Sequence, residues 1–225
     1  MTGLRRGLVA LGDSITNGYG EPMLGVRAQS WAQWAAQALE LPFTNLARDG
    51  ARVHDVLCEQ VPLLRGPYDL SCVYAGVNDV RDDAWDPDAF ARDLDAVLAA
   101  AAGASDALLV CTIPEDLGRP AAAPKPRAAN VLVRASAARH GARVVALDDL
   151  GDQLTMLPDA VHPTAMGQVA IAARAVAASG LPAGRSPADD AAPDRSRAAR
   201  LRWRRRRAVL AAQDLRRRAA ERLGG

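Results

Sequence analysis

The sequence predicts a doubly wound α/β sandwich built on a parallel sheet, and two patterns in its first 180 residues support this fold class. Five short apolar, β-branched runs recur, and they are largely apolar rather than alternating, as in strands buried on both faces. Helix-like segments separate these runs, and such strand–helix alternation is typical of α/β folds. A chain of 225 residues, 49% hydrophobic and 24% charged, is long enough for one such domain with a substantial core.

Five strands and five helices are expected to alternate along the body of the chain. The strands are expected at residues 7–11, 43–47, 70–75, 107–113 and 143–147. The helices between and after them are expected at residues 28–40, 53–64, 87–102, 127–140 and 164–179. Active sites in such folds lie beyond the carboxyl ends of the strands, so catalytic residues are expected in the segments that follow the strands.

The first apolar run and the last helix of this body can be assigned from the residues that precede them. The first apolar run follows Arg5 and Arg6 and is about five residues long, which is shorter than the core of a signal peptide. We interpret it as the first strand and expect no signal peptide. The last helix follows Pro163, a residue that suits the first turn of a helix. No run of about 18 apolar residues occurs, so no transmembrane helix is expected.

The composition changes after Gly180, and three parts of the chain are expected. Residues 1–181 form the α/β domain, and residues 182–195, rich in Pro, Ala and Asp, are typical of a linker. Residues 196–225 are expected to be a basic helical tail that ends in two glycines. Residues 185–225 carry 13 arginines and 5 acidic residues, a net charge of +8, so the first 184 residues, with 15 basic and 21 acidic residues, carry −6.

The cysteines indicate a reducing compartment. Cys58, Cys72 and Cys111 have no metal-ligand spacing, and their small number suits a reduced protein better than a disulfide framework. We therefore expect a cytoplasmic protein with no bound metal ion.

A serine with glycines on either side follows the first predicted strand directly. The segment reads Leu11-Gly-Asp-Ser-Ile-Thr-Asn-Gly18, so Ser14 is placed to present its hydroxyl at the edge of the sheet. The same residues also suit an ordinary helix N-cap, because Asp and Ser are favoured there. Taken alone, this segment leaves both interpretations open.

One of the three histidines has a candidate partner beside it. His140 is expected at the end of a helix, where a cation suits the helix dipole, and His54 is either a surface residue or part of a pocket lining. His162 lies on a loop just before a predicted helix, three residues after Asp159. An aspartate at this spacing can fold back on the loop and fix the imidazole tautomer. The alternative is a capping aspartate next to an unrelated histidine.

Two further segments at strand ends carry groups that can bind an oxyanion. Gly50 follows the second strand, and a glycine there leaves its backbone N–H open to a ligand. Asn78 follows the third strand in Gly76-Val-Asn-Asp79, and its side-chain N–H can donate to a developing negative charge. Tight turns at the glycines and a helix cap at Asn78 and Asp79 are the alternative explanations.

Taken together, these segments resemble the SGNH (GDSL) hydrolases, which are named for Ser, Gly, Asn and His in four separated blocks. The matching blocks are Gly12-Asp-Ser14, Gly50, Gly76-Val-Asn-Asp79 and Asp159-Ala-Val-His162. They occur in the family's order and span residues 12–162, so the resemblance covers the body and excludes the tail after residue 181. One departure is Ala160, where the family often has glycine.

The resemblance implies a flavodoxin-like, three-layer α/β/α fold with a five-stranded parallel sheet, and serine-dependent hydrolysis of carboxylic esters. Ser14 is then the nucleophile, His162 the general base and Asp159 its orienting carboxylate. The implied oxyanion hole consists of the backbone N–H groups of Ser14 and Gly50 and the side chain of Asn78. The reaction proceeds through an acyl-enzyme and needs no cofactor.

The connections between the predicted elements limit the substrate. They include no long insertion that could form a lid, and residues 17–27, 80–86 and 114–126 are expected to rim the site. A short rim favours small acyl groups on a small-molecule ester. The alcohol side of that ester and the oligomeric state are not defined by the sequence.

Two other functions stay open at this point. One is a protein of the same fold that binds a ligand without turnover. The other assigns the main role to the basic tail, as an anchor on an anionic membrane surface or a nucleic acid. The acidic body would repel the phosphates of a nucleic acid, so no nucleic-acid partner is expected.

The tail has an imperfectly amphipathic pattern. At helical spacing one stripe consists of Ala198, Leu201, Ala208, Ala212, Leu215, Ala219 and Leu223. Arg205 interrupts this stripe, and Trp203 and Leu210 fall on the opposite face. The pattern allows a solvated helix, a helix docked on the acidic body, or a membrane-surface helix.

Overall fold

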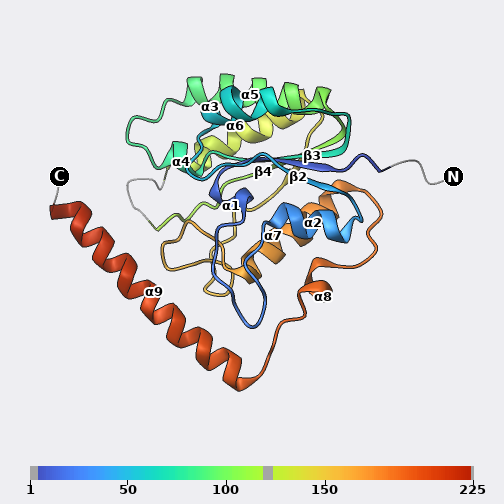
Figure 1. The fold of residues 1–225 in the computed structure, drawn as a ribbon. Helices are drawn as coiled ribbons and strands as arrows, with labels where there is room; N and C mark the ends of the chain where they lie inside the picture. Colours follow the sequence, from blue (N-terminus) through green and yellow to red (C-terminus); the bar gives the residue numbers. More distant parts are fainter. Residues whose placement is uncertain (1–4, 119–123, 224–225) are drawn as a thin grey trace.

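A computed structural model of the protein describes residues 5–118 and 124–223, and a five-stranded, all-parallel sheet lies at its centre (Figure 1). The strand order is β2-β1-β3-β4-β5, the flavodoxin-like order. The strands are β1 (Leu8–Gly12), β2 (Phe43–Asn45), β3 (Tyr68–Tyr74), β4 (Ser105–Cys111) and β5 (Arg143–Val145). All five expected strands are present, and their ends differ from the expected ones by at most two residues.

Helices cover both faces of the sheet. α3 (Val53–Asp55), α5 (Pro87–Gly103) and α6 (Lys125–Arg139) lie on one face, and α4 (Val77–Val80) contacts α6. α1 (Ser14–Asn17), α2 (Trp31–Ala38) and α7 (Ala165–Ser179) lie on the other face (Figure 1). The three-layer sandwich is therefore confirmed. The strand order reverses at β1 and β3, and the crevice beyond their carboxyl ends is where such folds place ligands.

The core explains why the strands are almost uniformly apolar. All five residues of β1 are buried, because helices shield the sheet from both sides. Small aliphatic side chains make up most of the core. The aromatic pair Trp31 and Tyr74 is fully buried and packs edge to face, with ring centroids 6.4 Å apart.

The helix expected at residues 53–64 is broken into three parts. The α-helical part, α3, ends at Asp55, Val56–Gln60 forms a π-helical turn, and Val61–Leu63 forms a 3₁₀ turn. Pro62 has no backbone N–H, so a regular α-helical hydrogen-bond ladder cannot continue through it. A π-helical turn of this kind often lies near a functional site.

The chain beyond α7 returns to the body. Residues 182–195, expected as a linker, contain the short helix α8 (Pro187–Ala191), which contacts α2 and α7. The long helix α9 (Arg197–Leu223) then passes below the body in the view of Figure 1. Its Trp203 joins the hydrophobic core. None of the helices in the described part of the chain is long and apolar enough to cross a bilayer.

Candidate active site

A tight turn at the carboxyl end of β1 presents Ser14. Gly12 ends the strand with φ +153°, and a side chain at this position would overlap the carbonyl of Tyr74. The Asp13 carboxylate accepts a hydrogen bond from the N–H of Ile15 (2.9 Å) and caps α1, whose first residue is Ser14. The N-cap is therefore Asp13, and the Ser14 hydroxyl remains available for another partner.

A single loop before α7 holds the histidine and the aspartate. Asp159 Oδ1 accepts hydrogen bonds from the N–H groups of Val161 and His162, both at 3.0 Å. Asp159 Oδ2 lies 2.7 Å from His162 Nδ1. Ala160 adopts φ +56°, in the left-handed region that favours glycine. The departure from the family's pattern at this position is therefore accommodated by a strained backbone.

Ser14 and His162 are 148 positions apart in sequence, yet Ser14 Oγ lies 3.0 Å from His162 Nε2. With Nδ1 donating to Asp159, Nε2 is the ring nitrogen that can accept the serine proton. Burial acts to raise the pKa of Asp159. The hydrogen bonds from the ring and N–H of His162, the histidine's charge and the N–H of Val161 outweigh burial, and the pKa falls from 3.8 to about 2. The carboxylate is therefore ionised at neutral pH.

Gly50 and Asn78 lie at the same edge of the sheet. Gly50 is exposed with φ +76°, and its N–H makes no hydrogen bond within the described part of the chain. Asn78 Nδ2 donates to the carbonyl of Ala51 (3.0 Å). This bond fixes the amide plane next to Gly50 and leaves the second N–H of the amide for another acceptor.

A chain of amides joins the Gly50 loop to the serine helix. Asn17 Nδ2 donates to Asp49 Oδ1 (2.8 Å), and Asn45 Nδ2 donates to Asn17 Oδ1 (3.1 Å). The five residues that the sequence singled out are thus connected, directly or through sequence neighbours: Ser14, Gly50, Asn78, Asp159 and His162.

Two buried glutamines, which the local sequence pattern did not reveal, hold this arrangement in place. Gln60 Nε2 donates to the carbonyl of Gly12 (2.8 Å), and its Oε1 accepts from the Gly12 N–H (2.9 Å). Gln168 Nε2 donates to the carbonyls of Ile15 (3.0 Å) and Tyr19 (3.1 Å). For Gln168 the available signal was a single amide in the otherwise apolar run of residues 165–173, whereas Gln60 directly follows Glu59 and has no such signal.

The other two histidines contact carboxylates away from the site. His54 is exposed, and its Nδ1 lies 2.9 Å from Asp93 Oδ2. His140 follows the last residue of α6, and its Nε2 lies 3.0 Å from Asp95 Oδ1. Of the three histidines, His162 is the one that meets Ser14.

The helix α9 packs against the loops that carry the site. Arg206 pairs with the Glu21 carboxylate through two hydrogen bonds of 2.6 and 3.1 Å. Arg207 donates to the carbonyls of Gln153 (3.0 Å) and Met156 (2.7 Å), in the segment that leads to Asp159. The tail is therefore in contact with the site, although the family resemblance does not extend to it.

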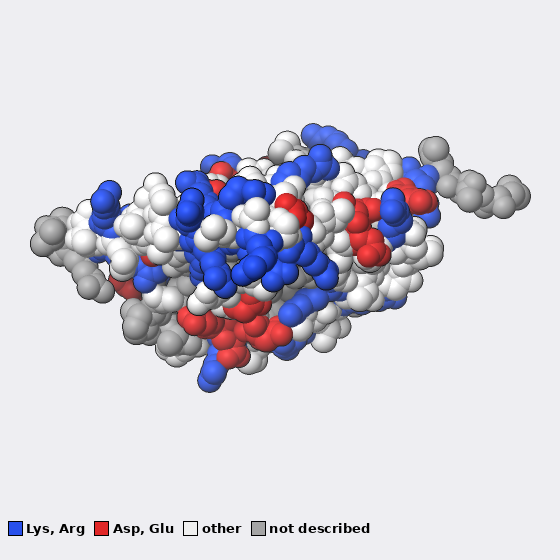
Figure 2. Space-filling model, turned by 90° about the horizontal axis from the view of Figure 1, so that it is seen from below, with Lys and Arg blue, Asp and Glu red and all other residues white. Residues whose placement is uncertain are grey.

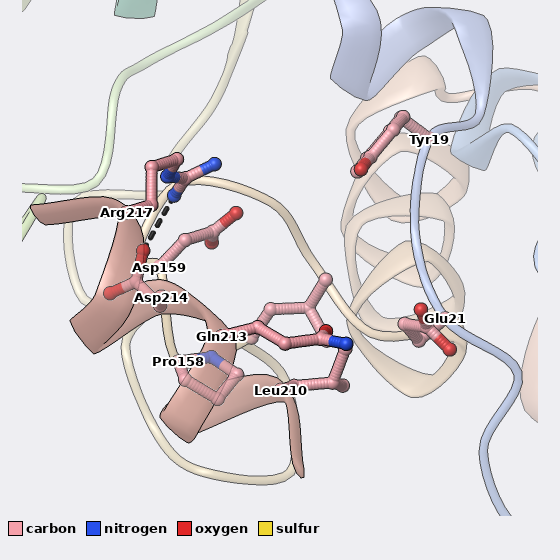
Figure 3. A pocket seen from close by; sticks show the side chains of 9 residues that line it. Tyr19, Glu21, Pro158, Asp159, Leu210, Gln213, Asp214 and Arg217 are labelled. Atoms are coloured by element: carbon pink, nitrogen blue, oxygen red, sulfur yellow. Dashed lines mark hydrogen bonds and ion pairs between the residues drawn. The ribbon is translucent and has the colours of Figure 1, made fainter. Parts of the chain in front are cut away.

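A pocket of about 200 Å³ lies between α9 and these loops (Figure 3). Its lining residues are Tyr19, Glu21, Leu157, Pro158 and Asp159 from the body and Leu210, Gln213, Asp214 and Arg217 from α9. Tyr19 packs against the His162 ring, with centroids 4.3 Å apart. Ser14 is not part of the lining, so the pocket adjoins the serine–histidine pair from the Asp159 side.

Asp13 is a buried carboxyl group next to Ser14 in the sequence. It is 1% exposed, and its Oδ2 has no hydrogen-bond partner within the described part of the chain. Burial raises the pKa of Asp13 from 3.8 to about 7, against the opposing effects of the Ile15 N–H and the His162 charge. The folded protein therefore binds this proton more tightly than the unfolded chain does.

This shift predicts a pH-dependent stability difference in the variant Asp13→Asn. The stability contributed by Asp13 is fully present below pH 3.8 and is lost as the pH rises through about 7. Asparagine keeps the capping oxygen and does not titrate. The unfolding free energy of the variant, relative to the wild type, should therefore rise by up to about 4 kcal/mol between about pH 4 and about pH 8. Urea titrations at both pH values check this, and a difference that stays constant with pH contradicts it.

A parallel sheet of this order, with a serine, a glycine, an asparagine and an Asp-x-x-His segment at its carboxyl edge, defines the SGNH class of hydrolases. The model of the GDSL-like lipase/acylhydrolase family matches residues 10–170. The chain belongs to this family. The matched range contains all five predicted site residues and ends within α7, before α8 and α9.

Solved structures of similar fold include LAE5, an α/β hydrolase from the metagenome of Lake Arreo, Spain, with 23% identity, a TM-score of 0.62, and coverage of 78% of this chain and 95% of that one. A lipase/acylhydrolase from Enterococcus faecalis has 20% identity and a TM-score of 0.62, covering 77% and 94%. Axe2, an acetylxylan esterase from Geobacillus stearothermophilus, has 17% identity and a TM-score of 0.59, covering 79% and 95%. A search of curated protein sequences found no match.

Proposed function

We propose that the protein is a serine esterase that hydrolyses carboxylic esters of small acyl groups through an acyl-enzyme. The observation that carries this proposal is the hydrogen-bonded series from Ser14 Oγ through His162 to Asp159, at 3.0 and 2.7 Å. Membership of a lipase/acylhydrolase family supports ester hydrolysis in general.

Each residue of the series has a defined part in the proposed mechanism. Ser14 Oγ attacks the ester carbonyl while His162 Nε2 takes its proton. Asp159, ionised because its pKa is about 2, holds the imidazole in the required tautomer and stabilises the imidazolium. His162 then donates the proton to the leaving alcohol. Water, activated by the same imidazole, releases the acid and restores Ser14.

The oxyanion of the tetrahedral intermediate would be bound at the edge of the sheet where Ser14, Gly50 and Asn78 lie. The proposed donors are the N–H groups of Ser14 and Gly50 and the free amide N–H of Asn78. In support, the Gly50 N–H has no partner within the described part of the chain, and Asn78 is held next to it through Ala51.

A fluorophosphonate probe, which reacts with an activated serine, tests this function. The wild-type protein is expected to be labelled and to hydrolyse p-nitrophenyl acetate. A protein of the same fold that only binds its ligand would show neither reaction, so an unlabelled wild type would favour that alternative.

The small acyl group is supported by the surroundings of the site. The pocket beside Asp159 is small, and polar side chains such as Glu21, Gln213 and Arg217 contribute to its lining. Of the segments expected to rim the site, residues 119–123 lie outside the described residues. Apart from Asn17 and Val80, which end α1 and α4, residues 17–27 and 80–86 consist of turns, loops and a bridge and contain no long insertion.

We expect acetyl and butyryl esters to be better substrates than palmitoyl esters. A long acyl chain gains binding energy only where it can bury its methylene groups, at about 0.8 kcal/mol each, and a small polar pocket offers little such surface. The measurement is kcat/KM for a series of p-nitrophenyl esters of increasing chain length. A higher kcat/KM for the dodecanoyl ester than for the butyryl ester would contradict this expectation.

The proposed location is the cytoplasm. Cys58 is an exposed free thiol, and Cys72 and Cys111 are buried free thiols, which suits a reducing compartment.

A further inference from the structure

The helix α9 has two faces with opposite roles. The inner face of α9, defined by Ala199, Trp203, Leu210 and Asp214, lies against the body. The arginines along this side have partners: Arg206 binds Glu21, Arg207 binds loop carbonyls, and Arg217 and Arg218 both pair with Asp214. The contact between α9 and the body therefore occupies one set of arginines. It also determines which side of the helix points away from the body.

The outer face of α9, defined by Leu201, Arg204, Arg205, Val209 and Leu215, is exposed. The three apolar side chains are 51%, 49% and 67% exposed. The side chains of Arg204 and Arg205 are exposed and make no hydrogen bond or ion pair within the described part of the chain. The apolar stripe predicted from the sequence thus faces solvent, and the residues predicted opposite it, Trp203 and Leu210, face the body. The side chain of Leu223 lies outside the described part.

Positive charge is concentrated on the side of the molecule where α9 lies. Figure 2 shows a field of basic side chains in the middle of the face below the sheet, where α9 lies, with acidic side chains gathered at its margin. The side chains of Arg197, Arg200 and Arg216 are also exposed and make no hydrogen bond or ion pair in the described part of the chain. The first 184 residues carry a net charge of −6. The carboxylates of this acidic body nevertheless form no ion pair with these three arginines in the described part of the chain.

A hollow next to the outer face combines apolar and basic groups. It has a volume of about 450 Å³ and lies between α9 and two loops of the body. It is lined by Met23, Leu24, Gln153, Leu154, Arg200, Trp203, Arg204 and Arg207. Leu154 is 58% exposed, so the apolar lining is open to the outside. Guanidinium groups around an apolar hollow fit an anionic group attached to a hydrocarbon chain.

We propose that the outer face of α9 binds the surface of an anionic phospholipid bilayer. The arginines would contact the lipid phosphates, and Leu201 and Leu215 would enter the boundary between headgroups and acyl chains. A nucleic acid would use the arginines, but its phosphate backbone offers no apolar layer to the exposed leucines of this face. Because the inner face of α9 touches the loops of Tyr19 and Asp159, the site lies about one helix diameter, roughly 10 Å, from the bound surface.

The experiment is co-sedimentation of the full-length protein with vesicles of phosphatidylglycerol and phosphatidylcholine, with pure phosphatidylcholine vesicles for comparison. Binding is expected for the anionic vesicles at low ionic strength, and it should weaken as salt is added. Each arginine near an anionic surface strengthens binding about fivefold, so Arg204→Ala with Arg205→Ala should lower the partition coefficient about 25-fold. Leu201→Gln with Leu215→Gln should lower it about tenfold, since apolar burial adds to the charge effect.

The matched control removes two arginines elsewhere. Arg5 and Arg92 are exposed and have no partner in the described part of the chain, and Arg92 lies on α5, across the sheet from α9. Arg5→Ala with Arg92→Ala should bind vesicles as the wild type does, and all three double variants should hydrolyse p-nitrophenyl acetate at the wild-type rate. The proposal fails if the wild type ignores anionic vesicles, if the Arg204 and Arg205 variant binds as strongly as the control, or if duplex DNA is retained and vesicles are not.

Discussion

Ser14→Ala is expected to lower kcat for p-nitrophenyl acetate by roughly 10³–10⁶-fold, because the members of a nucleophile–base–acid series act as a unit. The same variant should lose all labelling by a fluorophosphonate. The reason is geometric: Ser14 Oγ is 3.0 Å from His162 Nε2, and alanine has no atom there that could attack the carbonyl or lose a proton. His162→Ala should cause a loss of similar size, since the serine would keep its hydroxyl and lose its base.

The control is a buried serine that lies in the central sheet. Ser71 lies in β3, is fully buried, and its hydroxyl has no hydrogen-bond partner within the described part of the chain. Ser71→Ala should retain labelling and turnover, which separates loss of the nucleophile from a general effect of removing a serine. If Ser14→Ala keeps more than about a tenth of the wild-type activity, Ser14 is not the nucleophile.

The sheet and the order of the site segments could be predicted because they depend on patterns that are local in sequence. Strands buried on both faces must be apolar along their whole length, and β1 and β3 show this plainly. Parallel strands place their carboxyl ends at one edge of the sheet. Because each of Ser14, Gly50 and Asn78 follows a strand, the three residues were expected to lie near one another. His162 could be added because Asp159 lies three residues before it.

The contacts that hold the site in place were not predictable in the same way. Gln60 reaches Gly12 across 48 positions, and Gln168 reaches Ile15 across 153, so no local pattern connects them. The helix at residues 53–64 is broken because Pro62 cannot donate a backbone hydrogen bond. The spacing of apolar residues, from which the helix was predicted, does not take this into account.

The tail shows how a periodic pattern can suggest the wrong face. Leucine and alanine at helical spacing indicate an apolar stripe, and burial would be expected there. The face that contacts the body instead carries Trp203, whose large ring gains more from burial than leucine or alanine does. It also carries charged groups that bind specific partners, as Arg206 binds Glu21. Long arginine side chains can reach carbonyls and carboxylates over some distance, so the docked face was decided by partners in the body rather than by the helix itself.

Asn78→Ala is expected to lower kcat by about 10²–10³-fold with little change in KM. The amide would act on the oxyanion that forms during the reaction, so its removal weakens transition-state binding more than substrate binding. Its bond to the Ala51 carbonyl, at 3.0 Å, holds the amide in place before the substrate arrives, which is the condition for a large effect.

The matched control for this variant is Asn45→Ala, which truncates the asparagine at the end of β2. The Asn45 amide donates to Asn17, so its loss should loosen the Gly50 loop and leave the amide of Asn78 in place. We expect a change in kcat of less than about tenfold, since no charge-stabilising donor is removed. Thermal unfolding of both variants shows whether either loses its fold, because truncation at position 78 also leaves the Ala51 carbonyl without this partner. A rise in KM at constant kcat would mean that Asn78 binds the substrate in its ground state, and the oxyanion role would then have to be given up.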